Sequence, residues 1–255
     1  MLDDTKRAKQ EAAAAYAAET RGDYRAAAYH YSASGKLVSG KLQTWSFHEA
    51  AVAFRKCGES EQALIPLQSA SDAMLRDKDP YQEAQIHLTF GNALADCKRW
   101  HEATEYSRKS RHEFESLGYI IESHYGAIGE ACCLAALGEH DAAATIYKRL
   151  AKVGNPQEVR SQALNNLALL NAELGNETEA IDLVNEDLRL CKQVGDSFGE
   201  FVANVNMAQI LAELGRDHEA RSYTTIALSL GSAYNKTPPY VIAKGLIAKN
   251  KNRLE

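Results

Sequence analysis

The sequence has no long apolar segment. No run of apolar residues approaches the roughly 18 that a membrane-spanning helix requires. The N-terminal residues, MLDDTKRAKQ, also lack the apolar core of a secretory signal. We therefore expect a cytoplasmic protein without a membrane partner.

Cysteine is scarce, and its spacing excludes two common uses. The five cysteines are odd in number and none belongs to a CxxC motif, which argues against a disulfide framework and a zinc ribbon. The eight histidines form no HExxH motif, and the glycines form no GxGxxG motif. The sequence thus predicts no metal, no cofactor and no catalytic residue, and we do not expect an enzyme.

An excess of positive charge is also missing. The formal net charge is −5 at pH 7 and the isoelectric point is about 5.9. Proteins that bind nucleic acid need a basic surface to neutralise phosphates. We therefore expect no nucleic-acid partner.

What the sequence does contain is a repeat of a turn residue followed five positions later by alanine. The turn residues recur 36 to 40 positions apart, and they are Gly22, Gly58, Lys98, Gly138, Gly175 and Gly215. Seven positions before each of them lies another alanine or glycine. Small residues let two antiparallel helices approach closely, and glycine ends a helix in the left-handed conformation without steric cost. The pattern predicts six helix-turn-helix units.

These positions resemble the signature of tetratricopeptide repeat (TPR) proteins, in the subclass with repeats of about 40 residues. The segments AYAAETRGDYRAAAYHY, LAALGEHDAAATIY and LNAELGNETEAIDLV carry the small–Gly–Ala pattern. The resemblance implies an all-α fold, an α-α superhelix or TPR solenoid of about six helix-turn-helix repeats plus a C-terminal capping helix. It also implies a scaffold that binds proteins.

The repeat spacing gives expected boundaries. We expect one superhelical domain over residues 1–255, with repeats at about 8–43, 44–83, 84–123, 124–160, 161–200 and 201–235. Two prolines, Pro238 and Pro239, can begin a capping helix over 238–254. A solenoid needs such a polar-faced terminal unit to stay soluble.

The first helix of each unit is expected to line a concave groove. In the TPR subclass that this chain resembles, an asparagine just before a Leu–Gly/Ala pair projects into the groove. Asn166 and Asn206 match that pattern, and Asn92 lies one turn further along the wall. An amide both donates and accepts hydrogen bonds, so it can bind a peptide backbone of any sequence. The predicted neighbours are Gln162, Asn165 and Gln209. Alternatively, these amides are solvated or bridge adjacent repeats.

The first half of the groove has a different character, with Trp45, His48 and Arg55 as candidate binding residues. Aromatic and arginine side chains dominate binding hot spots, but Trp45 could equally pack between the first two units. In the C-terminal half, the rim carries Glu173 and Glu213, which favours a basic or neutral peptide.

The leading hypothesis is a protein–protein interaction scaffold that binds a peptide or a partner helix in the concave groove. An alternative is a peptide-sensing regulatory receptor of the bacterial regulator type, which acts on an effector protein. A further alternative is self-association, in which the partner is a second copy of the chain.

Overall fold

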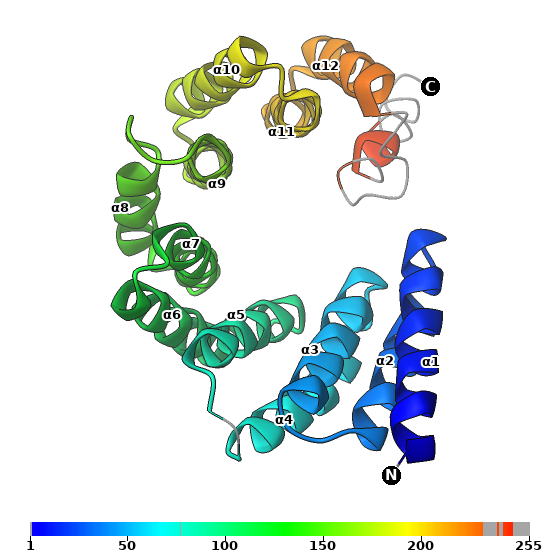
Figure 1. Ribbon diagram of the computed structural model, residues 1–255. Coiled ribbons are helices and arrows are strands. Elements are labelled where there is room, and N and C mark those ends of the chain that lie inside the picture. Colours follow the sequence, from blue (N-terminus) through cyan, green and yellow to red (C-terminus); the bar gives the residue numbers. More distant parts are fainter. Residues whose placement is uncertain (1, 77, 232–238, 240–241, 247–255) are drawn as a thin grey trace. The chain divides into compact units, whose positions relative to one another are not determined.

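The computed structural model describes residues 2–76, 78–231, 239 and 242–246 (Figure 1). Within these ranges the chain is helical, and the only β-type pairing there is one isolated bridge between Val153 and Asn155. None of the helices in the described ranges combines the length and the apolar character needed to cross a bilayer. The predicted all-α class is confirmed.

The chain divides into two compact units, Met1–Glu139 and His140–Glu255. Each unit is a stack of helices in which consecutive members pack against each other. The prediction that all of 1–255 forms one domain, divided into repeats at the stated boundaries, stays a prediction.

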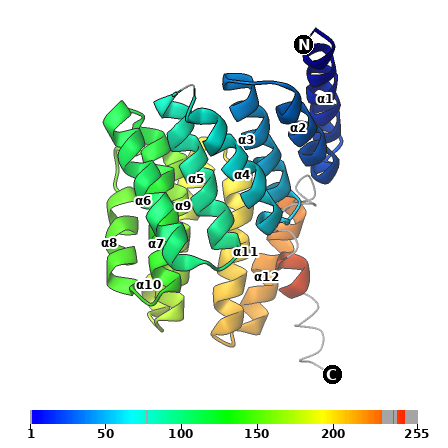
Figure 2. The same cartoon turned by 90° about the horizontal axis from the view of Figure 1, so that it is seen from below.

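The first unit contains seven helices among its described residues. Successive helices pack side by side from one end of the unit to the other (Figure 2). They are α1 (Leu2–Thr20), α2 (Tyr24–Leu37), α3 (Lys41–Lys56), α4 (Ser60–Met74), α5 (Pro80–Asp96), α6 (Trp100–Leu117) and α7 (Ile120–Ala136).

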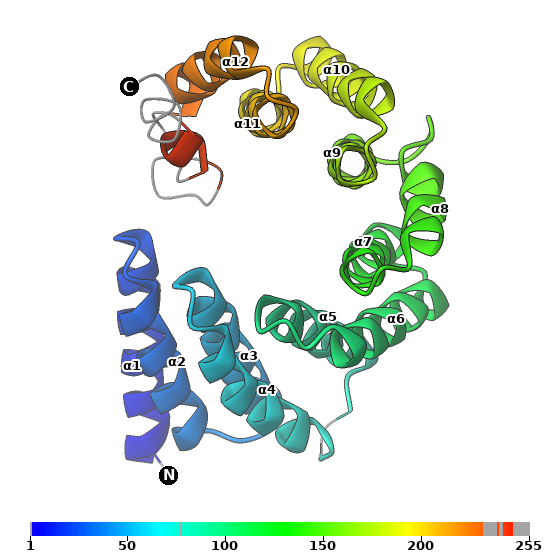
Figure 3. The ribbon, with the colours of Figure 1, turned by 180° about the vertical axis from the view of Figure 1, so that it is seen from behind.

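The second unit has two layers. Its helices are α8 (His140–Leu150), α9 (Gln157–Glu173), α10 (Glu177–Val194), α11 (Ser197–Glu213) and α12 (Asp217–Leu230). Helices α9 and α11 contact each other directly and form one wall, and α10 and α12 lie behind them (Figure 3). Of the predicted capping helix at 238–254, residues 239 and 242–246 are helical, and the rest lies outside the described residues.

The turns inside the helix pairs have the conformation that the repeat predicts. The glycines at 22, 58, 138, 175 and 215 all have φ between 73° and 82°. Lys98 occupies the same position with φ 59°, and no other described residue except glycine has a positive φ. At Gly58, the following Glu59 N–H donates to Phe54 O over 2.9 Å, so the last carbonyls of α3 are satisfied.

Small residues sit where paired helices are closest. The alanines at the predicted small positions, such as Ala51 and Ala63, are fully buried. At the glycine position of α5, a Cβ on Gly91 would lie 2.6 Å from Ser107 Oγ and 3.2 Å from Ser107 N. The predicted close packing of paired helices is therefore confirmed.

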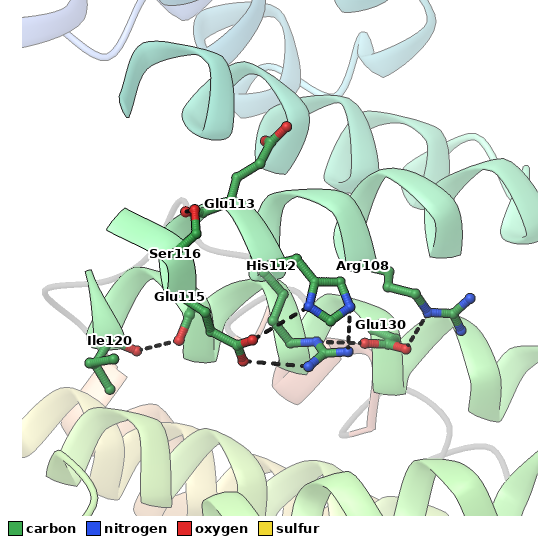
Figure 4. A network of polar contacts seen from close by, with 9 residues as sticks. Arg108, His112, Glu113, Glu115, Ser116, Ile120 and Glu130 are labelled. Atoms are coloured by element: carbon green, nitrogen blue, oxygen red, sulfur yellow. Dashed lines mark hydrogen bonds and ion pairs between the residues drawn. The ribbon is translucent and has the colours of Figure 1, made fainter. Parts of the chain in front are cut away.

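A buried carboxylate helps to fix α6 against α7. Glu130 on α7 is 4% exposed, and its two oxygens accept from two arginines of α6 (Figure 4). Arg108 Nε donates to Oε1 over 2.8 Å, and Arg111 Nε donates to Oε2 over 2.9 Å. Because a buried charge without a partner is costly, losing either helix's side of this double ion pair would destabilise the contact of α6 with α7.

Candidate functional site

A pocket lies on the wall formed by α9 and α11. Its volume is about 490 Å³, which is within the range of small-ligand and peptide-segment sites. Four apolar side chains, Leu169, Phe198, Val202 and Pro239, line it together with a set of amides. The amides are Gln162, Asn165, Asn166 and Asn206.

Helical spacing explains how these side chains come together. Residues three or four positions apart lie on the same face of a helix. Gln162, Asn166 and Leu169 follow this spacing on α9, and Val202 and Asn206 follow it on α11. The two helices are direct neighbours, so the two rows face one pocket.

The amides at the pocket form a chain of hydrogen bonds that begins at a buried acid. Asn206 Nδ2 donates to Asn165 Oδ1 over 2.8 Å, which joins α11 to α9. Asn165 Nδ2 donates in turn to Asp187 Oδ2 over 2.6 Å and to the Ser161 carbonyl over 3.0 Å. Asn165 is buried and Asp187 is fully buried. The alternative expected from the sequence, in which these amides bridge adjacent repeats, therefore applies to Asn165 and to the Nδ2 atom of Asn206.

The environment of Asp187 is unusual for a carboxyl group. Burial raises its pKa to about 6, although hydrogen bonds from Ser161, Asn165 and Cys191 act in the opposite direction. Burial, together with the nearby Asp187 charge, also raises the pKa of the Cys191 thiol to about 12. Cys191 is thus a protonated thiol at neutral pH, and it donates to Asp187 Oδ1 over 3.7 Å. It has no nucleophilic character there.

The structure brings together four of the predicted site residues, Gln162, Asn165, Asn166 and Asn206. Gln209 lies on α11 but does not line the pocket, and its Nε2 donates to Glu213 Oε1 over 3.2 Å. Asn92 belongs to α5 of the first unit, where it is half-buried.

The three candidates in the first unit have structural partners. His48 Nε2 lies 2.9 Å from Thr89 Oγ1, and Arg55 Nε donates to Asp96 Oδ2 over 2.9 Å, so both residues tie α3 to α5. Trp45 packs edge-on against Tyr31, with 5.6 Å between ring centroids, and stays 40% exposed. Trp45 thus both packs between α2 and α3 and presents part of its ring to solvent.

Two carboxylates at the pocket were not predicted from the sequence. Glu158 lies in the first turn of α9, and Asp196 precedes α11, where its Oδ1 accepts from Gly199 N over 2.9 Å. Both line the pocket, and no lysine or arginine is among its described lining residues. Acidic residues in the first turn of a helix are a recognisable capping signal. The sequence does not show, however, that these two residues line the same pocket.

The sequence also contains a motif that the sequence analysis overlooked. Residues 195–199, Gly-Asp-Ser-Phe-Gly, have the GxSxG spacing of a nucleophile elbow. That motif requires a strand before the serine, whereas α10 precedes it here and Gly195 ends that helix with φ 75°. No histidine is among the described residues that line the pocket. The segment ends α10 at Gly195 and caps the start of α11 at Asp196.

One cluster in the first unit has the composition of a metal site. Ligand atoms of Glu83, His87 and Glu113 all lie within 4.8 Å of one another. However, Lys109 Nζ lies 3.1 Å from His87 Nε2 and can only donate, so the ring proton sits on Nδ1. Nδ1 lies 2.7 Å from Glu113 Oε2. Since this arrangement uses both ring nitrogens, it fits a structural link between α5 and α6 better than a metal centre.

Two further hollows lie on the second helices of the second unit. One, of about 610 Å³, is lined by residues of α10 alone, so no neighbouring helix encloses a ligand there. The other, of about 630 Å³, is lined mainly by α10 and α12. The two basic side chains that line it already have partners within the chain. Arg189 Nε donates to Asn185 O over 3.3 Å, and Lys192 Nζ lies 3.8 Å from Glu200 Oε1. The α9–α11 pocket is the better candidate because amides from two helices converge on it.

No protein-family model matches the sequence, and no curated protein matches it either. Solved structures do match. A tetratricopeptide repeat protein from Parabacteroides merdae superposes with a TM-score of 0.65 at 15% identity, over 98% of this chain and 87% of that one. Aspartyl phosphate phosphatase F from Bacillus subtilis also gives a TM-score of 0.65 at 15% identity, over 80% of this chain. This chain spans only 56% of that protein's length.

A Rap protein in complex with competence and sporulation factor matches with a TM-score of 0.63 at 12% identity, over 94% of this chain and 73% of that one. At such identities the likeness concerns the fold. The fold is that of a TPR-type α-solenoid, as the sequence resemblance predicted.

Proposed function

We propose that this chain is a protein-interaction scaffold that binds an extended peptide segment of another protein in the α9–α11 pocket. The observation that carries the proposal is the convergence of Gln162, Asn166 and Asn206 on one pocket with apolar side chains between them. Amides can pair with both the N–H and the C=O of a peptide backbone. The apolar patch of Leu169, Phe198 and Val202 offers burial to peptide side chains.

The TPR-type fold supports this proposal, because it stacks helices whose exposed faces add up to one extended surface. The proposed role is binding without catalysis, and it requires no metal or cofactor. The same pocket also suits the alternative function of a peptide-sensing regulator that acts on an effector protein. The observation that favours this alternative is the likeness to a Rap protein bound to competence and sporulation factor.

The test begins with a library of random linear peptides displayed on phage and selected on the immobilised chain. Affinities of the enriched peptides are then measured by isothermal titration calorimetry on the wild type and on an Asn166→Ala/Asn206→Ala double variant. One hydrogen bond contributes about 0.5–1.5 kcal/mol. Two lost bonds should therefore weaken binding about 5- to 150-fold.

A matched control removes two amides from α10 instead, in an Asn185→Ala/Gln193→Ala variant. Asn185 also lines both hollows on the second helices. Circular dichroism confirms that both variants are folded. Equal affinity of the pocket variant and the wild type would refute the proposed site, and a loss confined to the control would move the site to α10.

A further inference from the structure

The hydrogen bonds behind the pocket fix the orientation of its amides. The Ser161 carbonyl only accepts, as does the Asp187 carboxylate when ionised. The atom of Asn165 that faces both must therefore be Nδ2, and its two protons are used by these two bonds. The opposite end of Asn165 is then its carbonyl oxygen, to which Asn206 Nδ2 donates.

This chain of bonds determines what Asn206 offers to a ligand. If the Asn206 amide turned over, its oxygen would face Asn165 Oδ1, and two acceptors would meet. Asn206 Oδ1 is therefore held at the end of the amide that faces away from Asn165. A ligand group that meets this oxygen has to be a hydrogen-bond donor.

The charged side chains among the described lining residues of the pocket are all acidic. Glu158 and Asp196 line it, and Asp187 lies directly behind Asn165. The described lining residues include no lysine or arginine. The aromatic ring of Phe198, which is 44% exposed, also lines the pocket and can contact a cation through its face.

We propose that the α9–α11 pocket is selective for a basic peptide. The peptide places an arginine or lysine side chain among Glu158, Asp196 and Phe198, and it donates an N–H to Asn206 Oδ1. Asp187 and the Ser161 carbonyl act as positioning groups because they hold Asn165, and through it Asn206, in the required orientation. This inference rests on the proposed function, and it adds the chemical class of the peptide.

The experiment uses two parallel selections from one random octapeptide display library. One selection is made on the wild type and the other on a Glu158→Gln/Asp196→Asn variant, which removes both charges. Asparagine also accepts at a helix N-terminus, so the cap of α11 is kept. We expect arginine and lysine to be enriched at one position by the wild type and not by the variant.

Calorimetry with a selected peptide and its analogue then measures the charge contribution. The analogue carries citrulline in place of arginine, or norleucine in place of lysine. A partly exposed ion pair is worth up to about 1 kcal/mol, or about fivefold in affinity. The double variant should bind the basic peptide up to about 25-fold more weakly and the neutral analogue about equally. Raising the salt concentration should reduce the difference.

A Glu179→Gln/Asp182→Asn variant is the matched control, because it removes the same net charge from the exposed face of α10. It should bind the basic peptide as the wild type does. An equal loss in this control would show that only net charge matters and would overturn the inference.

The donor to Asn206 is tested with depsipeptides, in which each backbone N–H of the peptide is replaced in turn by oxygen. One position should lose about 2- to 12-fold on the wild type and nothing on Asn206→Ala. The absence of any such coupled position would overturn the donor assignment.

The outcomes also separate this inference from the proposed function. Enriched peptides that are neutral or acidic, but still depend on Asn206, would overturn the inference and leave the proposed function standing. If no peptide is enriched, or if binding ignores Asn206→Ala, the proposed function fails and the inference fails with it.

Discussion

The buried carboxyl of Asp187 should make the stability of the second unit depend on pH in a direction opposite to the usual one for acids. Its pKa is raised from 3.8 to about 6 in the folded chain, chiefly by burial. The folded state therefore binds the proton more tightly than the unfolded state. Stability falls as pH rises from about 4 to above 6, where the carboxyl becomes ionised in both states.

The magnitude follows from the difference between the two pKa values. Each pKa unit corresponds to about 1.4 kcal/mol, so ionising Asp187 in the folded chain costs about 3 kcal/mol in full, of which about 2.4 kcal/mol develops between pH 4 and pH 7.5. An Asp187→Asn variant removes this titration and keeps an oxygen that can accept from Asn165. We expect the variant to be about 1–3 kcal/mol more stable than the wild type at pH 7.5, with the gain disappearing near pH 4.5.

Urea denaturation followed by circular dichroism at several pH values between 4.5 and 8 gives the difference between variant and wild type. Other acids titrate equally in both chains, so their contributions cancel from this difference. An Asp182→Asn variant, which changes an exposed acid on the same helix, should show a difference that does not vary with pH. A flat difference for Asp187→Asn as well would refute the account of the buried carboxyl.

Two further predictions concern the backbone of the first unit, one a left-handed turn and the other a close contact between helices. Lys98→Gly should raise the free energy of unfolding by about 0.5–1 kcal/mol. The left-handed φ of 59° costs lysine about 1–2 kcal/mol and glycine nothing, and the larger loss of backbone entropy by glycine on folding offsets part of that gain. Urea denaturation tests this, and a Lys98→Ala control should give no gain. Gly126→Ala should destabilise by about 1–3 kcal/mol, because its Cβ would lie 2.9 Å from Arg111 N and 3.0 Å from Arg111 Cα. The control is Gly129→Ala, whose nearest neighbour is the hydroxyl of Ser107 at 3.0 Å; equal loss in both would contradict the backbone contact as the cause.

Local signals made the helical plan predictable from the sequence. An alanine follows each turn residue at a constant distance of five positions, because every helix pair has to bring its two helices equally close. Even Lys98, the one turn position without glycine, adopts the conformation of the others because the flanking helices impose it.

The details of the site depend on contacts between helices of the second unit that repeat spacing does not encode. Asn165 and Asn166 are adjacent on α9, so their side chains point about 100° apart. Both line the pocket, and only the packing of α9 against α10 decides that Asn165 is the one that also meets Asp187. Arg55, a predicted binding residue, also pairs with Asp96, which lies 41 positions away in the next repeat of the same compact unit.

The acids of the pocket were missed for a related reason. Glu158 lies in the first turn of one helix and Asp196 precedes another, and the helix-to-helix connections before them differ in length and sequence. Periodicity therefore says nothing about where these two side chains point. Their shared position depends on how α9 and α11 pack together.

The central claim is that a peptide binds on the wall formed by α9 and α11, and hydrogen–deuterium exchange tests it most directly. Amide exchange is compared with and without a saturating selected peptide, because bound segments open less often and exchange more slowly. The account predicts that slower exchange is concentrated in α9 (Gln157–Glu173) and α11 (Ser197–Glu213). Slower exchange confined to α10 and α12, or to the first unit, would contradict it.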